Sequence, residues 1–230
     1  MKRLLLTACI LCIVTALIPL RGRLTKQYTP DWKQESMTYL PGDVAIRPAL
    51  LGYETTFAHY LWIRTIIYFG GHRMTDKTYR WIIPMLDMIT KLCPWFYPAY
   101  EFGGLMVPDV CNNPDAARIL LERGMTYLGS SRWNIAFYLG TIYLRYYDDR
   151  LTAAQYFGRA AFAQNAPREK LLAMAETFYK QGSSEETSLP LLYFLYQTSE
   201  NPEVRSYLAD KINTLLKASS VDDSNTLPIR

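Results

Sequence analysis

The chain has 230 residues, of which 50% are hydrophobic and 20% charged, and its formal net charge is +4. This size and apolar content exclude a wholly disordered chain and are sufficient for one large domain with its own core. Much of the positive charge lies within residues 1–33, so the remainder is nearly neutral and lacks the basic face of a nucleic-acid-binding protein. We therefore predict no nucleic-acid partner.

An apolar run from Leu4 to Leu20 opens the chain, with Lys2 and Arg3 before it and Arg21 after it. At about 17 residues it is near the lower limit for a membrane span and longer than most signal-peptide cores. We predict that residues 1–20 form an uncleaved anchor, with a cleaved signal peptide as the alternative. The expected location is the inner (cytoplasmic) membrane of a bacterial-type envelope, with the body in the periplasm. Cations on both sides of the run leave a cytoplasmic body open.

Prolines and a glycine, among them Pro30, Pro41 and Gly42, interrupt residues 21–47, which we predict to be an irregular tether. From residue 48 to residue 218 apolar side chains recur at helical spacing, and no alternating run is long enough to indicate a strand. We predict an all-α domain over residues 48–218. The small, polar residues 219–230 are expected to be a disordered tail.

The first helix of this domain is expected to run from Pro48 to Phe69. Because Glu54, His59 and Arg64 fall near its middle, it is too polar to be a confident membrane span. Two interpretations stay open: it is the first helix of a helix pair, which we favour, or it lies at a membrane surface or against a membrane partner.

Several later helix boundaries are marked in the sequence. Asn113 and Asn201 each precede a proline and an acidic residue, which is typical of a helix start. Gly70-Gly71 should end the first helix. Thr75-Asp76 should begin a helix that continues to Lys91 and kinks at Pro84.

The clearest internal pattern is an ordered set of small and aromatic residues that ends in a proline: Leu139, Gly140, Tyr143, Ala153, Phe157, Ala160 and Pro167. It resembles the tetratricopeptide repeat (TPR), whose pattern is W-x2-L-G-x2-Y, then A-x3-F, then a proline. Ala136 stands in the place of the tryptophan, and one extra residue separates the two halves. Weaker copies flank it in register, so the resemblance covers about residues 48–216. An irregular helical bundle is the alternative.

The resemblance implies a TPR-like α-solenoid of antiparallel helix pairs, preceded here by the anchor helix. The residues expected to pack the best repeat are Leu139, Gly140, Tyr143, Ala153, Phe157 and Ala160. Gly140 would be a notch that admits a neighbouring helix. Such arrays bind other proteins in a groove lined by the first helix of each pair. The residues expected there are Tyr97, Tyr100, Asn134, Phe137, Thr141 and Arg145.

The sequence offers little support for catalysis. Its two histidines, His59 and His72, are placed on a helix and in a turn without evident catalytic or metal-binding partners, and no phosphate-binding, hydrolase or zinc motif is present. We expect no enzyme activity, cofactor, metal site or small-molecule substrate. Cys93 and Cys111 should lie at opposite ends of one helix, too far apart for a disulfide.

These observations predict a membrane-tethered scaffold or assembly factor that binds other proteins of an envelope complex. The alternative is a non-catalytic structural or accessory subunit of a larger membrane or envelope complex. An unusually apolar outer surface around residues 48–106 would favour the subunit.

Overall fold

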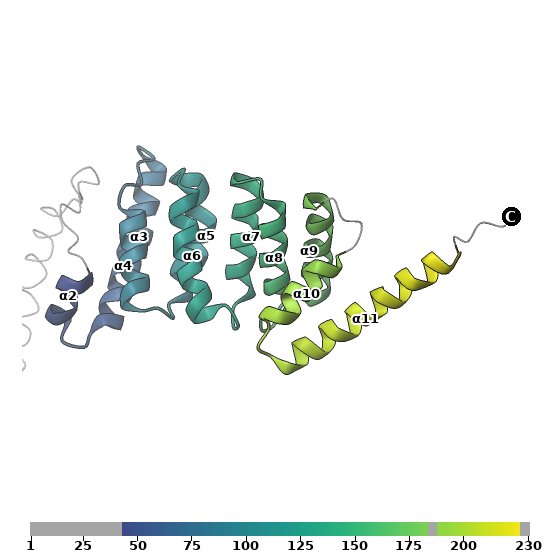
Figure 1. Cartoon of the computed structure of the whole chain (residues 1–230). Helices are drawn as coiled ribbons and strands as arrows, with labels where there is room; N and C mark the ends of the chain where they lie inside the picture. Colours follow the sequence, from purple (N-terminus) through teal and green to yellow (C-terminus); the bar gives the residue numbers. More distant parts are fainter. Residues whose placement is uncertain (1–42, 184–187, 226–230) are drawn as a thin grey trace, which may run out of the picture. The chain divides into compact units, whose positions relative to one another are not determined.

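The computed structural model describes residues 43–183 and 188–225, and every regular element in this part of the chain is an α-helix (Figure 1). The all-α prediction is thus confirmed for the described residues. The helices are α2 (Asp43–Leu50), α3 (Glu54–Met74), α4 (Ile82–Leu92), α5 (Tyr97–Val110), α6 (Pro114–Leu128), α7 (Trp133–Tyr146), α8 (Arg150–Ala161), α9 (Arg168–Gly182), α10 (Leu189–Thr198) and α11 (Pro202–Asn225).

None of these helices combines the length and the apolar character that crossing a bilayer requires. The predicted anchor, residues 1–20, lies outside the described residues, as does most of the predicted tether.

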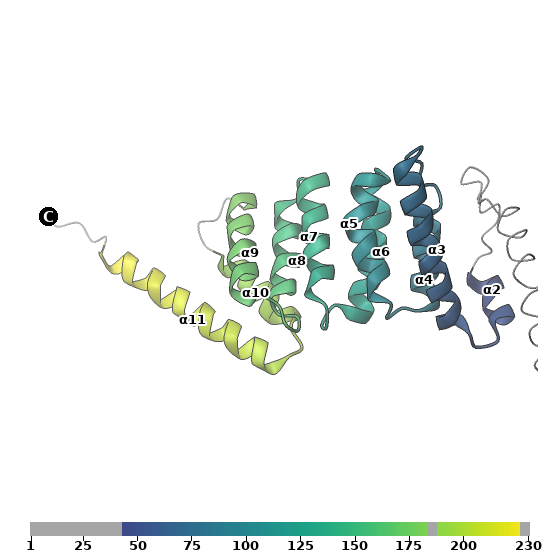
Figure 2. The same ribbon diagram turned by 180° about the vertical axis from the view of Figure 1, so that it is seen from behind.

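Helices that follow one another in the chain pack in pairs: α3 with α4, α5 with α6, and α7 with α8 (Figures 1 and 2). Successive pairs also touch, because α4 contacts α5 and α6 contacts α7. Further contacts join α5 to α7, α4 to α6, and α8 to α10, which are alternate helices of the chain. α8 also packs against α9, so each helix from α4 to α8 contacts both helices adjacent to it in the chain and a second helix beyond one of them.

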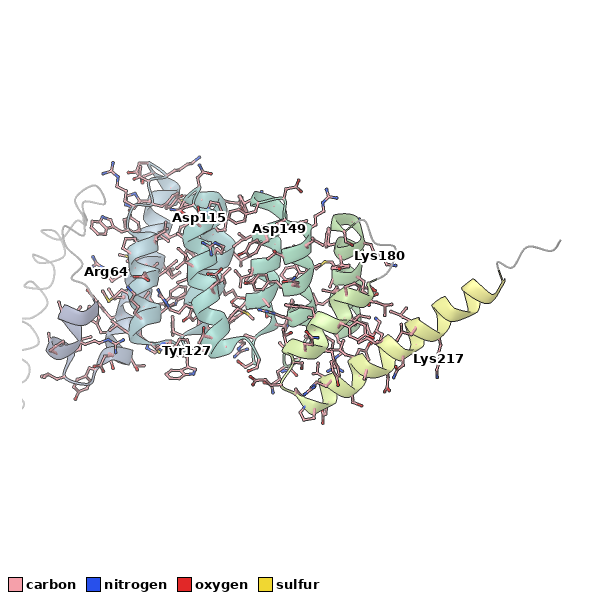
Figure 3. All side chains as sticks on the ribbon, in the orientation of Figure 1. Arg64, Asp115, Tyr127, Asp149, Lys180 and Lys217 are labelled. Carbon is pink, nitrogen blue, oxygen red and sulfur yellow. The ribbon has the colours of Figure 1, made fainter. Side chains whose placement is uncertain are left out.

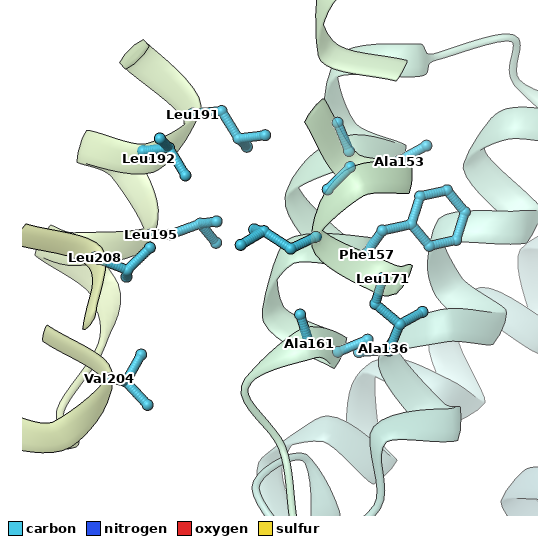
Figure 4. Packing of buried hydrophobic residues seen from close by; sticks show 14 of the residues in the cluster. Ala136, Ala153, Phe157, Ala161, Leu171, Leu191, Leu192, Leu195, Val204 and Leu208 are labelled. Carbon is cyan, nitrogen blue, oxygen red and sulfur yellow. The ribbon is translucent and has the colours of Figure 1, made fainter. Parts of the chain in front are cut away.

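The core around α8 is built largely from small side chains. Ala136, Ala153 and Ala160 are fully buried there, and leucines of α9 and α10 pack on them (Figure 4). Small residues let helix axes approach closely, and the apolar area that this removes from water stabilises the packing by about 25 cal/mol per Å². Phe157 is the large side chain of this cluster, 2% exposed, with Phe137 and Phe178 beside its ring.

Gly140 lies where α7 crosses the ring of Phe157. A Cβ at this position would stand 2.6 Å from the Phe157 ring carbon Cε1, well inside van der Waals contact. Leu139, Ala153, Phe157 and Ala160 of the same predicted set are buried, and Tyr143 is half-buried and stacks on Tyr156. The glycine thus allows α7 to approach α8 closely, at the cost of its low helix propensity.

The expected single helix over residues 48–69 is two helices. Leu51 and Gly52 have positive φ angles of 49° and 91°, so the chain turns between α2 and α3. The predicted tether 21–47 is accordingly too long, because α2 already begins at Asp43. Gly52 explains the break, since glycine adopts positive φ without steric cost.

The predicted boundaries between the first helices are also wrong. α3 continues through Gly70-Gly71 to Met74, because glycine weakens a helix without ending it. Residues 75–81 are a turn rather than a helix start, and α4 begins at Ile82. Pro84 therefore lies in the first turn of α4, where its missing N–H costs no hydrogen bond. The kink that we predicted at Pro84 assumed that the helix began near Thr75.

Both predicted asparagine caps are present. The Asn113 side chain accepts a hydrogen bond of 2.9 Å from the Ala116 amide, and Asn201 accepts one of 2.9 Å from the Glu203 amide. α11 then extends to Asn225, past the expected end of the domain at residue 218. Residues 219–225, the first part of the predicted tail, thus lie in α11 and contain no glycine or proline that would end the helix.

The two described cysteines are not bridged, as the sequence predicts. Cys93 follows the end of α4 and Cys111 follows the end of α5, so the whole length of α5 separates them. Burial raises the pKa of the Cys111 thiol, which keeps it protonated and unreactive at neutral pH.

Candidate protein-binding face

The outward sides of α5 and α7 carry polar and aromatic side chains in register. Glu101, Leu105 and Asp109 recur every four residues on α5, and Asn134, Tyr138, Thr141 and Arg145 do so, at spacings of three or four, on α7. We call these seven residues the α5–α7 face. All are exposed or half-buried, while the opposite sides of both helices supply buried residues such as Tyr100 and Leu139.

One cluster on this face centres on the carboxylate of Glu101. The Tyr97 hydroxyl donates to Glu101 Oε1 over 2.8 Å, and the Tyr138 hydroxyl of α7 donates to the same oxygen over 3.5 Å. The Arg132 guanidinium carbon lies 4.8 Å from the centroid of the Tyr97 ring, within cation–π range. The cluster therefore links α5 to α7 through hydrogen-bonding groups that remain partly accessible.

Burial and the negative charge of Glu101 both raise the pKa of the Tyr97 and Tyr138 hydroxyls. Burial is the larger cause in both tyrosines. Because both hydroxyls stay protonated across the physiological range, they act as hydrogen-bond donors and not as bases.

A second cluster lies nearer the C-terminal ends of α5 and α7, around Asp109. Arg145 Nη1 is 3.1 Å from Asp109 Oδ2, and the Tyr146 hydroxyl donates to Oδ1 over 2.5 Å. The Arg145 and Asp109 side chains are 62% and 49% exposed, so a partner can reach both charges. An exposed pair of this kind contributes little to stability, typically about 0–1 kcal/mol. Arg145 and Asp109 can therefore each exchange this ion pair for a contact with a bound protein at little cost in stability.

A third contact lies beside this cluster. Asp115 lies in the first turn of α6 (Figure 3). It accepts a hydrogen bond of 2.5 Å from the hydroxyl of Tyr147, the residue that follows α7. The arrangement leaves aromatic rings and acidic oxygens side by side at one end of the two helices. Tyrosine and arginine are enriched in protein recognition surfaces, whereas nothing in this arrangement resembles a nucleophile with its base.

One of the six residues predicted to line a groove is misplaced. Tyr100 is fully buried, its ring packs against Gly124 of α6, and its hydroxyl donates to the carbonyl of Pro94 over 3.0 Å. Burial raises the pKa of this hydroxyl to about 12. Tyr100 lies on the side of α5 that faces α6, so it belongs to the core.

Phe137 is a second partial correction. It is half-buried, with its ring centroid 5.6 Å from that of Phe157 and 5.7 Å from that of Trp133, and it packs on the buried cluster around α8. Its ring therefore contributes to the packing of the core, while part of the side chain remains exposed.

The other four predicted residues do lie on or beside the α5–α7 face. Tyr97, Asn134 and Thr141 are half-buried, and Arg145 is exposed. The Thr141 hydroxyl donates to the Phe137 carbonyl of its own helix over 3.0 Å. The structure brings Tyr97 and Asn134 to one cluster and Arg145 to the other.

Sequence reasoning missed Asp109, Tyr138 and Arg132 as members of the two clusters. The available signal was the spacing of Glu101, Leu105 and Asp109, which places them on one side of a helix. The helix α5 continues through Pro108 to Val110, so Asp109 lies on the same helix as Glu101 and Leu105.

Both histidines lie on α3, so the expectation that His72 sits in a turn is wrong. His72 Nδ1 is 2.5 Å from Asp76 Oδ1, and the Thr78 hydroxyl donates to Asp76 Oδ2 over 2.8 Å. The hydrogen bond with His72 is the main reason why the pKa of Asp76 is held far below its usual value. These contacts tie the end of α3 to the following turn.

Within the described ranges, no three side chains of the metal-binding types come together. Comparisons with protein-family models, with curated proteins and with solved structures give no significant match.

Proposed function

We propose that this chain is a non-catalytic scaffold or assembly factor at the cell-envelope membrane, with a TPR-like solenoid that binds partner proteins. In this proposal residues 4–20 anchor it as a single span in the inner membrane. The helical domain then faces the periplasm, and its partners are other proteins of an envelope complex.

Contacts between alternate helices support the solenoid. In a stack of helix pairs, each first helix touches the next first helix, and each second helix touches the next second helix. The contacts of α5 with α7, α4 with α6 and α8 with α10 follow this rule. The close approach of α7 to Phe157 at Gly140 adds the small-residue packing that the repeat pattern implies.

The observation that carries the function is the α5–α7 face. Two neighbouring first helices present tyrosine, arginine and carboxylate groups that contact each other without being sealed from solvent. A peptide segment laid along this face would find hydrogen-bond donors, acceptors and aromatic edges at regular intervals.

A structural subunit of a larger complex is the second candidate, and the surface of α3 favours it. Ile63, Ile67 and Met74 of this helix are 58%, 46% and 85% exposed. Apolar side chains that gather on one exposed surface generally mark a contact with another body.

A pull-down of the full-length protein from detergent-solubilised membranes separates the two candidates. Varied partners in less than stoichiometric amounts support the scaffold, whereas one complex recovered in equal amounts supports the subunit. The double variant Leu105→Ser with Arg145→Ala should lose the partners while keeping the melting temperature, because both side chains are exposed.

The matched control is Tyr193→Ser with Lys180→Ala, which changes one exposed apolar and one exposed basic side chain on α10 and α9 (Figure 3). It should keep all partners. If both double variants retain every partner, the α5–α7 face is not the binding surface.

A further inference from the structure

Helix α3 is apolar on two opposite sides. Its inner side supplies Ala58, Leu61 and Tyr68, which are 0%, 2% and 7% exposed. The exposed side carries a second apolar set, which we call the α3 apolar face: Tyr60, Ile63, Ile66, Ile67 and Met74. The exposed positions between residues 55 and 70 also include Thr55, Thr56 and His59, and Arg64 is half-buried. The exposed side of α3 is therefore apolar over most, but not all, of its positions, and an apolar surface of this kind generally marks a contact with another body.

The neighbours of α3 in the described structure leave this face open. α3 contacts α2 and α4, and its inner rings Trp62 and Phe69 pack on Phe102 of α5. Just before α3, Leu51 and Tyr53 are 84% and 70% exposed and extend the apolar surface.

Basic side chains surround the C-terminal end of the same helix. Arg73, Lys77 and Arg80 are all exposed. The one acidic residue among them, Asp76, is engaged by His72 and Thr78. An apolar surface with basic residues at its border and tyrosines at its edge matches the interface of an anionic lipid bilayer.

The sequence before α2 would hold α3 close to the membrane. Residues 21–42 separate the apolar run from α2, and fully extended they would reach no more than about 80 Å. A second contact made by a tethered domain is intramolecular, so even a weak affinity is sufficient to populate it. This step rests on the anchor in the proposed function.

We propose that α3 is a membrane-surface helix. Its apolar face lies in the headgroup layer of an anionic bilayer, with the helix parallel to the surface and Arg73, Lys77 and Arg80 among the lipid phosphates.

Site-specific photocrosslinking of the full-length chain tests this directly. A benzophenone amino acid replaces Ile67, and the protein is reconstituted into vesicles of phosphatidylethanolamine and phosphatidylglycerol. The same probe at Tyr193 of α10, which is 44% exposed, is the control. After vesicle flotation and irradiation, mass spectrometry identifies what each probe has attached to. We expect phospholipid adducts at position 67 and none at position 193.

Two further arms sharpen the result. Ile63→Asp, at a position that is 58% exposed, should abolish the lipid adduct at position 67 while the melting temperature is kept. Vesicles of phosphatidylcholine alone should reduce the adduct, because the basic residues then lose their anionic partners.

Attachment of the probe at position 67 to residues 1–40, to a second copy or to another protein overturns the proposal. So does the absence of any adduct in protein that floats with the vesicles, and in that case the anchor itself stands. Protein that fails to float overturns both the anchor and the surface helix.

Discussion

The exposed sides of α3 and α11 differ sharply in chemistry. On α3 the exposed residues include Tyr60, Ile63 and Ile67, whereas on α11 they include Glu203, Arg205 and Asp210. Both helices bury a comparable apolar stripe on the other side, such as Leu61 on α3 and Leu208 on α11. An exposed apolar surface generally marks a contact with a second body. The exposed side of α3 has such a surface, whereas the exposed side of α11 is largely polar.

A large loss of stability is expected where α7 packs on α8, between the two helices compared above. Gly140→Leu must displace the Phe157 ring, whose Cε1 atom would lie 2.6 Å from a new Cβ, and should cost about 3 kcal/mol of unfolding free energy. Gly70→Ala on α3 is the control, because nothing lies within 4 Å of its Cβ position. It should stabilise the helix by about 0.5–1 kcal/mol. Urea denaturation measures the unfolding free energy of both variants. Equal changes in the two would contradict the close packing proposed at Gly140.

The next effect concerns the attachment of α11. Lys211 Nζ lies 2.6 Å from the solvent-shielded Oε1 atom of Glu176 on α9. Lys211→Met leaves that charge without its partner and should cost about 1.5 kcal/mol, with faster amide hydrogen exchange along α11. Adding Glu176→Gln should recover part of the loss. If the loss of unfolding free energy in the double variant equals the sum of the losses in Lys211→Met and Glu176→Gln alone, the ion pair does not hold α11.

A smaller, pH-dependent effect is expected between α4 and α6. Arg123 Nη2 is 2.8 Å from Asp87 Oδ1, and Arg123 Nη1 is 2.8 Å from the hydroxyl of the buried Thr90. Burial alone would raise the pKa of Asp87, but hydrogen bonds from Lys91 and Arg123 outweigh it and hold the pKa below its usual value.

The folded state therefore gains stability from Asp87 above about pH 4, the pKa of an unfolded aspartate, and loses it as the pH falls through the lower folded value. Asp87→Asn should cost about 1 kcal/mol at pH 7. This difference from the unmodified protein should shrink progressively below about pH 4 in urea titrations. A constant difference at all pH values would show that the charge is not the cause.

The smallest effect on stability is expected on the exposed side of α3. Ile63→Lys should change the unfolding free energy by no more than about 0.5 kcal/mol, because the side chain is 58% exposed. Leu61→Lys, two residues away and 2% exposed, should prevent stable folding, because it buries an unpaired charge. Comparable losses in the two variants would mean that Ile63 is packed within the same chain, and the contrast with α11 would fail.

Features that depend only on residues close together in the chain could be predicted from the sequence. The caps at Asn113 and Asn201 each need only a residue two or three places further along the chain. The helical character of the described residues follows from apolar periodicity in the same way. The break at Leu51-Gly52 was missed because its flanking residues suit a helix, and only the positive φ angles reveal the turn.

The candidate site depended on information that no local pattern contains. Arg145 and Asp109 are 36 residues apart in the chain, and their pairing exists only because α5 and α7 lie together. Tyr100 was placed in a groove because a tyrosine suits both an interface and a core, and its side of α5 is decided by Gly124 of α6. Burial of such amphipathic side chains is a property of the packing and not of the residue.

The most direct test of the central claim is a crosslinking map of the full-length protein in cells. The same benzophenone probe replaces Leu105 on α5 and Arg145 on α7, and in separate variants Ile119 on α6 and Tyr193 on α10, all of which are exposed. The account predicts protein adducts from positions 105 and 145, and none from positions 119 and 193. Protein adducts from positions 119 and 193 alone would contradict it, because partners would then bind the opposite side of the helix pairs.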